Sequence, residues 1–252
     1  MKKSILLSIQ ALGRLIRFIP FTIRKNSLFF LFLLESRNGK PQQALSNLFQ
    51  VQDLLDKVIN ERALALGNGE HPKHTLTHYH NFFINSLSGC LRILDIGCGY
   101  GAVARSLSFS LPKSIVTGID NDPLKIQQAI SAINPINLNF QICDVYNFGD
   151  LGQFDGYVLS NVLEHLDDRV GLLKLIGNSS PNAKIAIRVP LYERHWTIPL
   201  RDMLGVNYFQ DDDHRIEHKL RDFNEELSQA NLRPIMQITL WGEIWTTCEF
   251  TK

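Results

Sequence analysis

The sequence contains few cysteines, and their spacing matches neither a zinc site nor a disulfide framework. Its four cysteines form no CxxC pair and no closely spaced group: Cys90, Cys98, Cys143 and Cys248. Structural zinc sites need closely paired ligands, and small secreted domains depend on dense disulfides. Neither is expected here, and we predict a protein of a reducing compartment with a cytoplasmic location.

Long hydrophobic runs are also missing. In the first 34 residues the longest unbroken run, Leu28–Leu34, has seven residues, whereas a membrane-spanning helix needs about 20. The start MKKSILLSI resembles a secretory signal, but Gln10, Arg14 and Arg17 interrupt its apolar part and no small-residue cleavage site follows. A cleaved signal is not expected, while an organelle transit peptide, also poor in acids and containing arginine, stays open.

The chain has no excess of charge of one sign. Lys and Arg number 26 and Asp and Glu number 25, so the net charge is +1, and no nucleic-acid partner is expected. The distribution is uneven, because residues 1–40 hold eight basic residues and one acidic residue, a local charge of +7.

This basic segment carries apolar residues at helical spacing, namely Leu12, Leu15, Ile16 and Ile19. Such a helix can pack on its own domain or lie on an anionic membrane surface. Both interpretations stay open. The second predicts peripheral contact with the inner face of the membrane through residues 1–40.

A longer helix is predicted from Gln42 to about Leu66, because its apolar residues follow the 3.6-residue period and Gly67 and Gly69 follow it. We expect it to act as a lid or brace. The predicted domains are a helical N-terminal extension, residues 1–69, and a globular domain, residues 70–252.

From residue 90 onward, short apolar runs alternate with helical patterns, which predicts an α/β fold with a doubly wound parallel sheet. The predicted strands are 91–96, 114–119, 138–143, 157–160, 184–189, 234–240 and 244–250, and the predicted helices are 102–109, 123–133, 168–176 and 222–230. Only Trp241-Gly242-Glu243 separates the last two strands. These strands should therefore form an antiparallel hairpin.

A glycine-rich turn, Gly97-Cys98-Gly99-Tyr100-Gly101, joins the first strand to the first helix. Glycines at this place let the backbone approach a ligand closely. Asp120 ends the next strand, 25 residues after Asp95, and Asp144 follows the third strand. Each acid alone is equally well explained as a turn former. Together, at the carboxyl ends of consecutive strands, they predict a ligand site, with Asp120 placed to accept hydrogen bonds from a ribose diol.

Four segments, in order and at the usual spacing, resemble the signatures of class I S-adenosylmethionine-dependent methyltransferases. They are LDIGCGYG (94–101), GIDNDP (118–123), CDVYNF (143–148) and FDGYVLSNVLEHLDD (154–168). The resemblance covers about residues 90–190 and implies a Rossmann-like seven-stranded sheet with an antiparallel C-terminal strand. GCGYG departs from the dinucleotide pattern GxGxxG, which counts against an NAD-dependent oxidoreductase.

The resemblance also implies S-adenosylmethionine as cofactor and assigns residues to its parts. The loop of Asp95, Gly97, Gly99 and Gly101 would lie under the methionine part. The other assignments are Asp120 for the ribose hydroxyls, Asn121 beside the adenosine, Asp144 and Val145 at the adenine edge, Asn161 near the sulfonium and Tyr79 closing over the cofactor.

Three further segments resemble a subgroup of these enzymes associated with surface-polysaccharide synthesis. They are residues 71–83, 189–218 and 241–245. This narrower resemblance implies O-methylation of a saccharide or lipid-linked saccharide. The acceptor would then be a small molecule or a glycolipid.

The stretch Leu191–Leu220 has no clear periodicity and is rich in Tyr, His, Trp, Arg and Asp. Long loops inside a compact domain are usually functional, and we predict that this one contacts the acceptor. His195 and His214 are the candidate catalytic bases, because imidazole accepts a proton near neutral pH. Each is also explained as an ordinary surface or hydrogen-bonded histidine.

Other side chains of this region have weaker roles. Tyr192 and Glu217 are lesser candidates for the base, and His165 is expected to orient a loop. Arg194, Arg201 and Arg215 either clamp a phosphate or carboxylate of the acceptor or pair with Asp211–Asp213.

Two groups of histidines suggest metal sites. His214-Arg215-Ile216-Glu217-His218 has the HxxEH pattern of certain zinc peptidases, but that pattern needs a helix and a third ligand. His74 and His78 are four residues apart, so they could share a helix face. No nearby Cys or acid completes that set, and we predict no metal.

Two alternatives from other classes stay open. One is a non-catalytic S-adenosylmethionine-binding partner of a glycosyltransferase, and the other is a zinc metallopeptidase based on HxxEH. The sequence predicts no oligomeric state.

Overall fold

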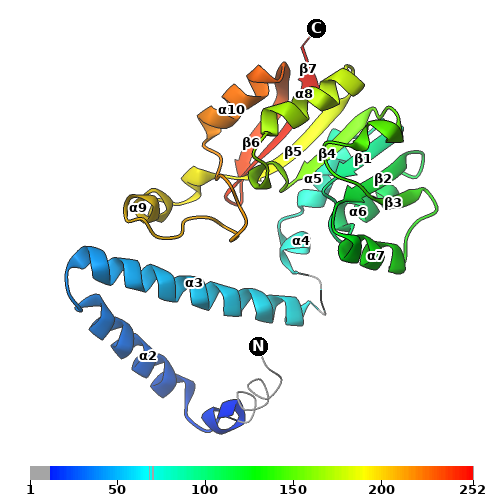
Figure 1. Ribbon diagram of the computed structural model, residues 1–252. Coiled ribbons are helices and arrows are strands. Elements are labelled where there is room, and N and C mark those ends of the chain that lie inside the picture. The colour runs from blue at the N-terminus through cyan, green and yellow to red at the C-terminus, as the bar shows by residue number, and fades with distance from the viewer. Residues whose placement is uncertain (1–11, 68, 70, 252) are drawn as a thin grey trace. The chain divides into compact units, whose positions relative to one another are not determined.

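The computed structural model describes residues 12–67, 69 and 71–251, which form two compact units (Figure 1). One unit contains the described residues up to Arg62 together with Arg201–Asn207, and the other contains Ala63–Leu200 and the chain from Tyr208 onward. The signal-like start of the sequence lies outside the described residues.

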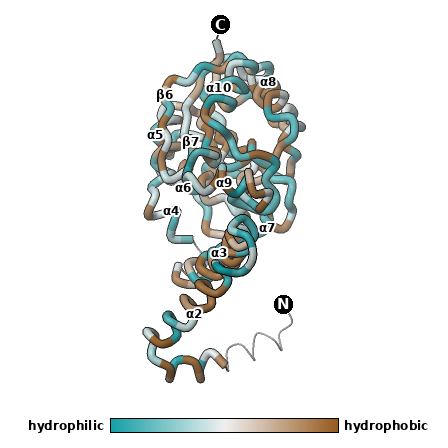
Figure 2. Tube along the Cα trace, turned by 90° about the vertical axis from the view of Figure 1, so that its left-hand side faces the viewer, coloured by the Kyte–Doolittle hydropathy of each residue, from teal (hydrophilic) through white to brown (hydrophobic). Residues whose placement is uncertain are grey.

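The first unit is helical. A short helical stretch at residues 12–16 precedes α2 (Phe21–Ser36) and α3 (Pro41–Leu66). The predicted helix from Gln42 to Leu66 is confirmed as α3. None of the residues of α2 is buried, and Figure 2 colours much of this helix as hydrophobic. Within the described residues, no helix has the length and hydropathy needed to cross a bilayer.

Segment Arg201–Asn207 joins this first unit through Arg201. The Arg201 guanidinium donates to Asp53 Oδ1 at 2.8 Å and lies over the Phe49 ring, 4.3 Å from its centroid. Arg201 is only 5% exposed. Its acidic partner is therefore Asp53, whereas the sequence left open a contact with the acceptor or a pair with Asp211–Asp213.

The second unit is built on one seven-stranded sheet in the order β3-β2-β1-β4-β5-β7-β6. The strands are β1 (Arg92–Ile96), β2 (Ile115–Asp120), β3 (Leu138–Ile142), β4 (Gly156–Ser160), β5 (Lys184–Pro190), β6 (Leu232–Leu240) and β7 (Glu243–Phe250). Strand β7 runs antiparallel to both of its neighbours. The predicted α/β fold with a reversed C-terminal strand is confirmed.

Helices cover both faces of the sheet. The helices that pack on it are α5 (Tyr79–Ser86), α6 (Ala102–Ser110), α7 (Pro123–Ser131), α8 (Arg169–Ser179) and α10 (Leu220–Gln229). The other helical elements are α4 (Lys73–Leu76), α9 (Thr197–Met203) and the 3-10 turns η1 (Phe148–Leu151), η2 (Leu163–His165) and η3 (Tyr192–Arg194). One core cluster joins the sheet to α8 and α10, and a second joins it to α5 and α6. Strands buried on both faces explain why β1, β4 and β5 are largely continuous apolar runs.

Neighbouring residues in the chain determine where helix α7 begins and how strands β6 and β7 are joined. Asp122 caps α7, because its Oδ1 accepts the backbone N–H of Leu124 at 2.8 Å, and Pro123 begins the helix. The two residues between β6 and β7, Trp241 and Gly242, both have positive φ, 56° and 77°. This is the signature of a type I′ hairpin turn, so the predicted hairpin is confirmed.

The parallel strands β1 to β5 all end at the same edge of the sheet, which we call the carboxyl edge. Ligands of open α/β sheets bind outside this edge. The glycine loop after β1, Asp120 at the end of β2 and Asn161 after β4 are all located there. The stretch predicted to lack regular structure, Leu191–Leu220, also follows the carboxyl end of β5, and it contains η3 and α9 before an irregular segment.

Candidate functional site

The glycine loop after β1 has the backbone that its sequence predicts. Gly97, Gly99 and Gly101 have φ values of 67°, 54° and 77°, a region that other residues rarely adopt. A Cβ at Gly101 would lie 2.4 Å from the ring of Phe140, whereas a Cβ at Gly99 would meet nothing within 4 Å. The loop is therefore closed toward the domain at Gly101 and open at Gly99, where a ligand can approach.

Asp95, the last residue but one of β1, is buried below this loop. It is 1% exposed, and its Oδ2 has no hydrogen-bond partner. Burial raises the pKa of Asp95 to about 8, against the effect of a hydrogen bond from the Ala104 backbone, and the charge of Asp120 raises it further. A buried carboxylate oxygen without a partner is costly, so this site favours a ligand that brings a hydrogen-bond donor or a positive charge.

Asp120 links the end of β2 to the glycine loop. Its Oδ2 accepts the N–H of Gly99 at 2.9 Å, and its Oδ1 accepts the N–H of Asp122 at 2.9 Å. The carboxylate is thereby fixed in orientation. Since each oxygen can accept a second hydrogen bond, Asp120 still has capacity for the hydroxyl groups of a ligand.

The residues predicted to contact adenosine follow β2 and β3 at the carboxyl edge. Asn121 and Asp144 are exposed, and Val145 is half-buried. Asp144 Oδ1 accepts the N–H of Tyr146 at 2.9 Å, which holds the turn after β3. These positions are compatible with the roles implied by the resemblance, which stay predictions.

Asn161 is the centre of a partly buried hydrogen-bond network. It has a positive φ of 56°, and its Nδ2 donates to Glu164 Oε1 at 2.7 Å. Its Oδ1 accepts from Arg188 Nε of β5 at 2.7 Å. Arg188 Nε also lies 3.5 Å from Glu243 Oε2, so the network reaches the first residue of β7.

The network continues to Tyr79, the first residue of α5. The Arg188 guanidinium carbon lies 3.6 Å from the centroid of the Tyr79 ring. Tyr79 is 3% exposed, and its hydroxyl group is hydrogen-bonded to His74. Burial raises the pKa of Tyr79 to about 12, although Arg188 opposes this shift. Tyr79 is therefore a neutral, packed side chain; its closure over a cofactor stays a prediction.

The histidines before β1 do not share one helix face. The helical path breaks at His78, which has a φ of 53° between α4 and α5. His74 belongs to α4 and contacts Tyr79, so the expectation that His74 and His78 lie on one face is wrong. His80 lies beside His74 and Tyr79, with its ring centroid 5.4 Å from that of His74 and 4.4 Å from that of Tyr79, and its Nδ1 pairs with Ser106 Oγ at 2.7 Å.

His214 and His195, the two candidate bases, lie in different surroundings. His214 is buried, and its Nδ1 pairs with Glu217 Oε1 at 2.9 Å. Burial opposes its protonation, but the hydrogen bond to Glu217 and the charges of Glu164 and Asp211 outweigh burial and raise the pKa of His214. His195 is exposed and pairs with Thr197 Oγ1 at 2.7 Å, two residues further along the chain.

Glu164 and His165, both in η2, approach His214 from the end of β4. The rings of His165 and His214 are 4.8 Å apart and almost perpendicular. The backbone also ties the two segments together, because Arg215 N donates to Glu164 O at 2.7 Å. Burial raises the pKa of Glu164 to about 7, and the hydrogen bond from Asn161 opposes the shift. His214 thus belongs to the carboxyl edge.

The HxxEH segment is irregular, not helical. His218 packs against Phe223, and its Nε2 lies 3.4 Å from Glu226 Oε2. Glu217 binds His214 and Arg194. His214 and His218 therefore have separate partners, unlike the paired zinc ligands of a peptidase helix.

The other site residues predicted from the sequence, Arg194, Arg215 and Tyr192, each contact a charged side chain of this protein. Arg194 pairs with Glu217, and Arg215 Nε lies 4.0 Å from Asp167. Both arginines have acidic partners other than Asp211–Asp213. Tyr192 is buried, with the Lys219 ammonium 4.8 Å from the centroid of its ring.

Two central residues, Arg188 and Glu164, were not selected from the sequence. Arg188 interrupts the apolar strand KIAIRVP, and a charged residue inside a buried strand signals a partner. Glu164 is followed directly by His165, but only the fold brings His214 beside both.

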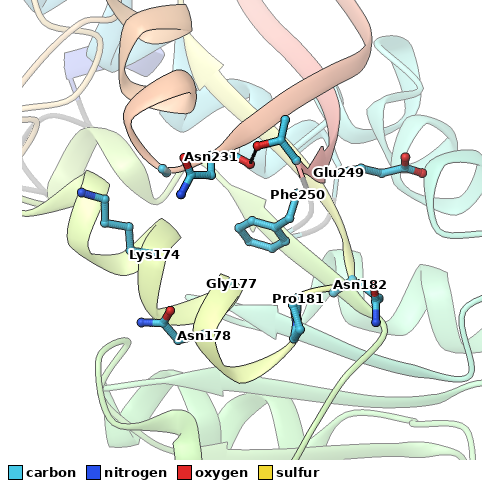
Figure 3. Close-up of a pocket in the computed structure, with 11 residues that line it drawn as sticks. Lys174, Gly177, Asn178, Pro181, Asn182, Asn231, Glu249 and Phe250 are labelled. Carbon is cyan, nitrogen blue, oxygen red and sulfur yellow. Dashed lines mark hydrogen bonds between the residues drawn. The ribbon is translucent and has the colours of Figure 1, made fainter.

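A pocket of about 460 Å³ lies at the other edge of the sheet (Figure 3). Lys174 and Asn178 of α8, Pro181 before β5 and Phe250 at the end of β7 line it. Asn231 also lines it and is hydrogen-bonded to Thr251. Since β7 is antiparallel to β5, this is the edge where β5 begins, so the pocket is separate from the Asp95 and Asn161 groups.

Comparison with known proteins agrees with this geometry. Residues 93–178, about a third of the chain, match the family described as "Methyltransferase domain". A curated relative, the ribosomal protein L11 methyltransferase of Thermosipho africanus (strain TCF52B), is 30% identical over 145 residues, which are 53% of this chain and 54% of the relative. The match thus spans about half the length of that relative.

Solved structures share the fold at low sequence identity. Human N-acetylserotonin methyltransferase in complex with SAM has a TM-score of 0.58 at 19% identity, covering 77% of this chain and 57% of that one. The mitomycin 7-O-methyltransferase MmcR has a TM-score of 0.57 at 14% identity, and the match covers 87% of this chain and 60% of MmcR. Together with the family match, the shared fold supports a class I S-adenosylmethionine-dependent methyltransferase domain.

Proposed function

We propose that this protein transfers a methyl group from S-adenosylmethionine to a hydroxyl group of an acceptor. The observation that carries the proposal is the buried, unpartnered Oδ2 of Asp95 beside a glycine loop that is open at Gly99. S-adenosylmethionine brings an ammonium group, which would donate to Asp95, and a ribose diol, which would donate to Asp120. The domain match and the named ligand of the human neighbour support this choice.

The remaining cofactor contacts follow the order of the strands. Asn121 after β2, and Asp144 and Val145 after β3, would hold the adenosine. Asn161, fixed by Arg188 and Glu164, would lie beside the reactive end of the cofactor. Buried side chains that hold one another in place can align two reactants, which supplies much of the rate enhancement in displacement reactions.

When bound, S-adenosylmethionine supplies an electrophilic methyl group on a sulfonium centre. This chain has to align the acceptor oxygen with that group and to assist loss of its proton. His214 lies with Glu164 and His165 at the carboxyl edge next to Asn161, whereas the contacts of His195 are local. We therefore assign assistance of deprotonation to the group around His214.

The acceptor proposed is a saccharide or lipid-linked saccharide. A saccharide offers many hydroxyl groups together with apolar ring faces. The segment after β5 matches this chemistry, because it combines polar side chains with Trp196, which is 71% exposed and whose ring can pack on an apolar face. MmcR is named as an O-methyltransferase, which supports oxygen as the atom methylated.

The cofactor assignment is tested by calorimetric titration of the full chain with S-adenosylhomocysteine. We expect binding by the wild type, weaker binding by Asp120→Ala, unchanged binding by Asp150→Ala, an exposed acid of η1, and no binding of NAD. Absence of binding by a folded wild-type sample would contradict the proposal.

The acceptor is tested with radiolabelled cofactor and cell-envelope saccharide fractions. Transfer to these fractions is the expected result. Turnover of small amines or quinones, with none of saccharides, would overturn the proposed acceptor. Binding of S-adenosylhomocysteine without transfer to any extract would instead favour the non-catalytic partner of a glycosyltransferase.

We also propose that the N-terminal unit contacts an anionic membrane surface. Helix α2 exposes Phe29 and Phe30, each 60%, and carries Arg24 and Lys25 in its first half. Apolar residues beside basic ones fit a bilayer with anionic headgroups, because the rings enter the interface while the cations remain at the lipid charges. Lipid-linked acceptors would be met on such a surface.

Flotation with vesicles containing phosphatidylglycerol tests the membrane proposal on the full chain. We expect the wild type to float, and Phe29→Ser/Phe30→Ser and Arg24→Glu/Lys25→Glu to float less. Phe109→Ser removes a phenylalanine of α6 that is 63% exposed and should float like the wild type. Equal flotation of all four proteins would overturn the proposal.

A further inference from the structure

Glu164, His165 and His214 bring three potential metal-ligating atoms together at the carboxyl edge. One carboxylate oxygen and one ring nitrogen of each histidine lie within 4.8 Å of one another. Among the residues that the structure describes, this is the one such group of three. Ligands of one ion at about 2.1 Å lie about 3–4 Å apart, so small side-chain rotations are enough to bring these atoms into range.

The carboxylate of Glu164 gives independent evidence for a ligand. Glu164 is fully buried, and its Oε1 accepts from Asn161 Nδ2 at 2.7 Å. Its Oε2, however, has no hydrogen-bond partner. Leaving a carboxylate oxygen buried and unpaired costs free energy, and a cation at this oxygen removes that cost.

His214 is oriented as a ligand by the residues behind it. Its Nδ1 pairs with Glu217 Oε1 at 2.9 Å, which leaves Nε2 to face away from Glu217. Glu217 is held in turn by the side chain of Arg194 and by the N–H of Gln210 at 2.7 Å. A carboxylate behind the second ring nitrogen is the usual arrangement at metal-binding histidines.

Charge and access at the group also suit a cation. Asp211 Oδ2 lies 3.6 Å from His214 Nε2, and Asp213 Oδ2 lies 3.4 Å from His165 Nδ1. Both aspartates are exposed, so they add negative potential on the solvent side. His165 also lines a pocket of about 410 Å³ with residues 166–168 and Tyr146, so one member of the group borders a cavity.

We propose that Glu164, His165 and His214 bind a divalent transition-metal ion, with Asp211 as an additional ligand or a partner for bound water. Two imidazoles and one carboxylate favour ions such as Mn²⁺, Fe²⁺ or Zn²⁺ over Mg²⁺ and Ca²⁺, which prefer oxygen ligands alone. The site differs from the HxxEH set, because it uses His165 and not His218. It also replaces the sequence-based expectation of no metal.

The role of the ion rests on the proposed methyl transfer, although binding of the ion does not. Three protein ligands leave positions for oxygen atoms of the acceptor. A hydroxyl group bound to the ion becomes more acidic, so its O–H bond breaks and the proton passes to a water molecule. The oxygen then forms its bond to the methyl carbon, the sulfur–carbon bond breaks, and the sulfur keeps the electron pair. Neighbouring hydroxyl groups of a saccharide could occupy two of the open positions.

Direct ion binding by the full chain tests the proposal without requiring activity. Metal-free protein is titrated with Mn²⁺ while the signal of free Mn²⁺ is followed by electron paramagnetic resonance, and with Zn²⁺ and Mg²⁺ by calorimetry. We expect one Mn²⁺ or Zn²⁺ per chain and much weaker binding of Mg²⁺. Glu164→Gln and His214→Gln should each lower the affinity by at least about tenfold, and Glu217→Gln by about tenfold or more through loss of orientation.

Controls separate this site from others on the surface. His195→Gln alters an exposed histidine outside the group and should bind the ion like the wild type. Circular dichroism and urea unfolding show whether each variant is folded, and for a variant that is not, Asp211→Asn gives a milder test at the group's exposed rim. The proposal would be overturned if the wild type bound no ion. It would also be overturned if folded Glu164→Gln and His214→Gln bound the ion with the affinity of the wild type.

Measurements on the same samples distinguish failure of the proposed metal site from failure of the proposed methyl transfer. Titration with S-adenosylhomocysteine in the presence of EDTA reports the cofactor site alone. Cofactor binding without any ion binding would overturn the metal site and leave methyl transfer in place. Ion binding without cofactor binding would support the metal site and contradict the proposed function.

Discussion

The guanidinium carbon of Arg188 lies 3.6 Å from the ring centroid of Tyr79, so a residue of β5 and the first residue of α5 stack inside the domain. Arg188 also donates to Asn161 and lies near Glu243. One cation therefore connects α5, the residue after β4, β5 and β7. A buried charge with several partners fixes their relative positions, and its loss leaves the partners unsatisfied.

Replacing Arg188 should accordingly destabilise the fold. Arg188→Met removes a buried cation that contacts Asn161 and the half-buried carboxylate of Glu243, and we expect a loss of about 3–5 kcal/mol in the free energy of unfolding. Urea unfolding measures this loss. Arg233→Met, at an exposed position of β6, is the matched control and should change stability little. Equal effects of the two substitutions would contradict the role assigned to Arg188.

Glu226 makes the stability of the domain depend on pH. Arg169 Nη2 donates to Glu226 Oε1 at 2.7 Å, and His218 lies beside the other oxygen. Burial opposes ionisation of Glu226, but these two partners outweigh it and lower its pKa to about 2. A carboxylate whose pKa is lower in the folded state stabilises the protein above pH 4.5 and loses this contribution as the pH falls toward 2.

The comparison of the wild type with Glu226→Gln isolates this contribution. Between pH 6 and pH 3, the free energy of unfolding of the wild type should fall by about 2 kcal/mol more than that of the variant. Urea midpoints over this range are the measurement. Parallel pH curves for the two proteins would show that Glu226 is not held ionised by Arg169 and His218.

Two glycines of the loop should respond differently to the same change. Gly101→Ala places a Cβ 2.4 Å from Phe140 at a φ of 77°, and we expect a loss of about 2–4 kcal/mol in stability. Gly99→Ala meets open space, so it should cost only about 1 kcal/mol from its backbone conformation. Its methyl group would occupy the space proposed for the cofactor.

Unfolding and binding measured together test this pair. Gly99→Ala should weaken the binding of S-adenosylhomocysteine at least about tenfold, a loss of about 1.4 kcal/mol in binding free energy. If Gly99→Ala binds like the wild type, the open side of the loop does not face the ligand. If Gly101→Ala is as stable as the wild type, the loop can move away from Phe140.

A buried tyrosine hydroxyl offers a test of the core. Tyr157 of β4 is fully buried, and its Oη is 2.8 Å from Ser180 Oγ. Tyr157→Phe should lower stability by about 1 kcal/mol, because Ser180 loses a partner that water cannot replace. Tyr146→Phe removes an exposed hydroxyl that donates to Asp168 O at 3.0 Å and should have little effect. Similar urea midpoints for the two variants would contradict this difference.

The parts of the fold that the sequence predicts well are those with local causes. Apolar strands followed by glycines, the Asp122–Pro123 helix start and the Trp241–Gly242 turn each depend on neighbours in the chain. Their ranges were predicted to within a few residues. The short helices α4 and α9 were not predicted, because one or two turns leave too few residues for a periodic pattern.

The candidate site is only partly predictable from the sequence, because many of its contacts join residues that are far apart in the chain. Asp95 and Asp120 follow directly from strand ends. The contacts of Glu164 with His214, and of Asn161 with Arg188, join residues that are 50 and 27 positions apart, and no local pattern encodes which of many polar side chains meet. Arg201 shows the opposite error, since a residue grouped with the acceptor loop by sequence is paired with Asp53.

The reversed direction of β7 has a practical consequence. Glu243, at its start, is paired with Pro190 at the carboxyl edge, and Glu249, near its end, is paired with Lys184 at the opposite edge. A fluorescent protein or affinity tag fused after the last strand would therefore begin at the edge opposite Asp120 and Asn161. Such a fusion leaves the approach to the glycine loop free, which makes the C-terminus the suitable attachment point for immobilising this domain in binding measurements.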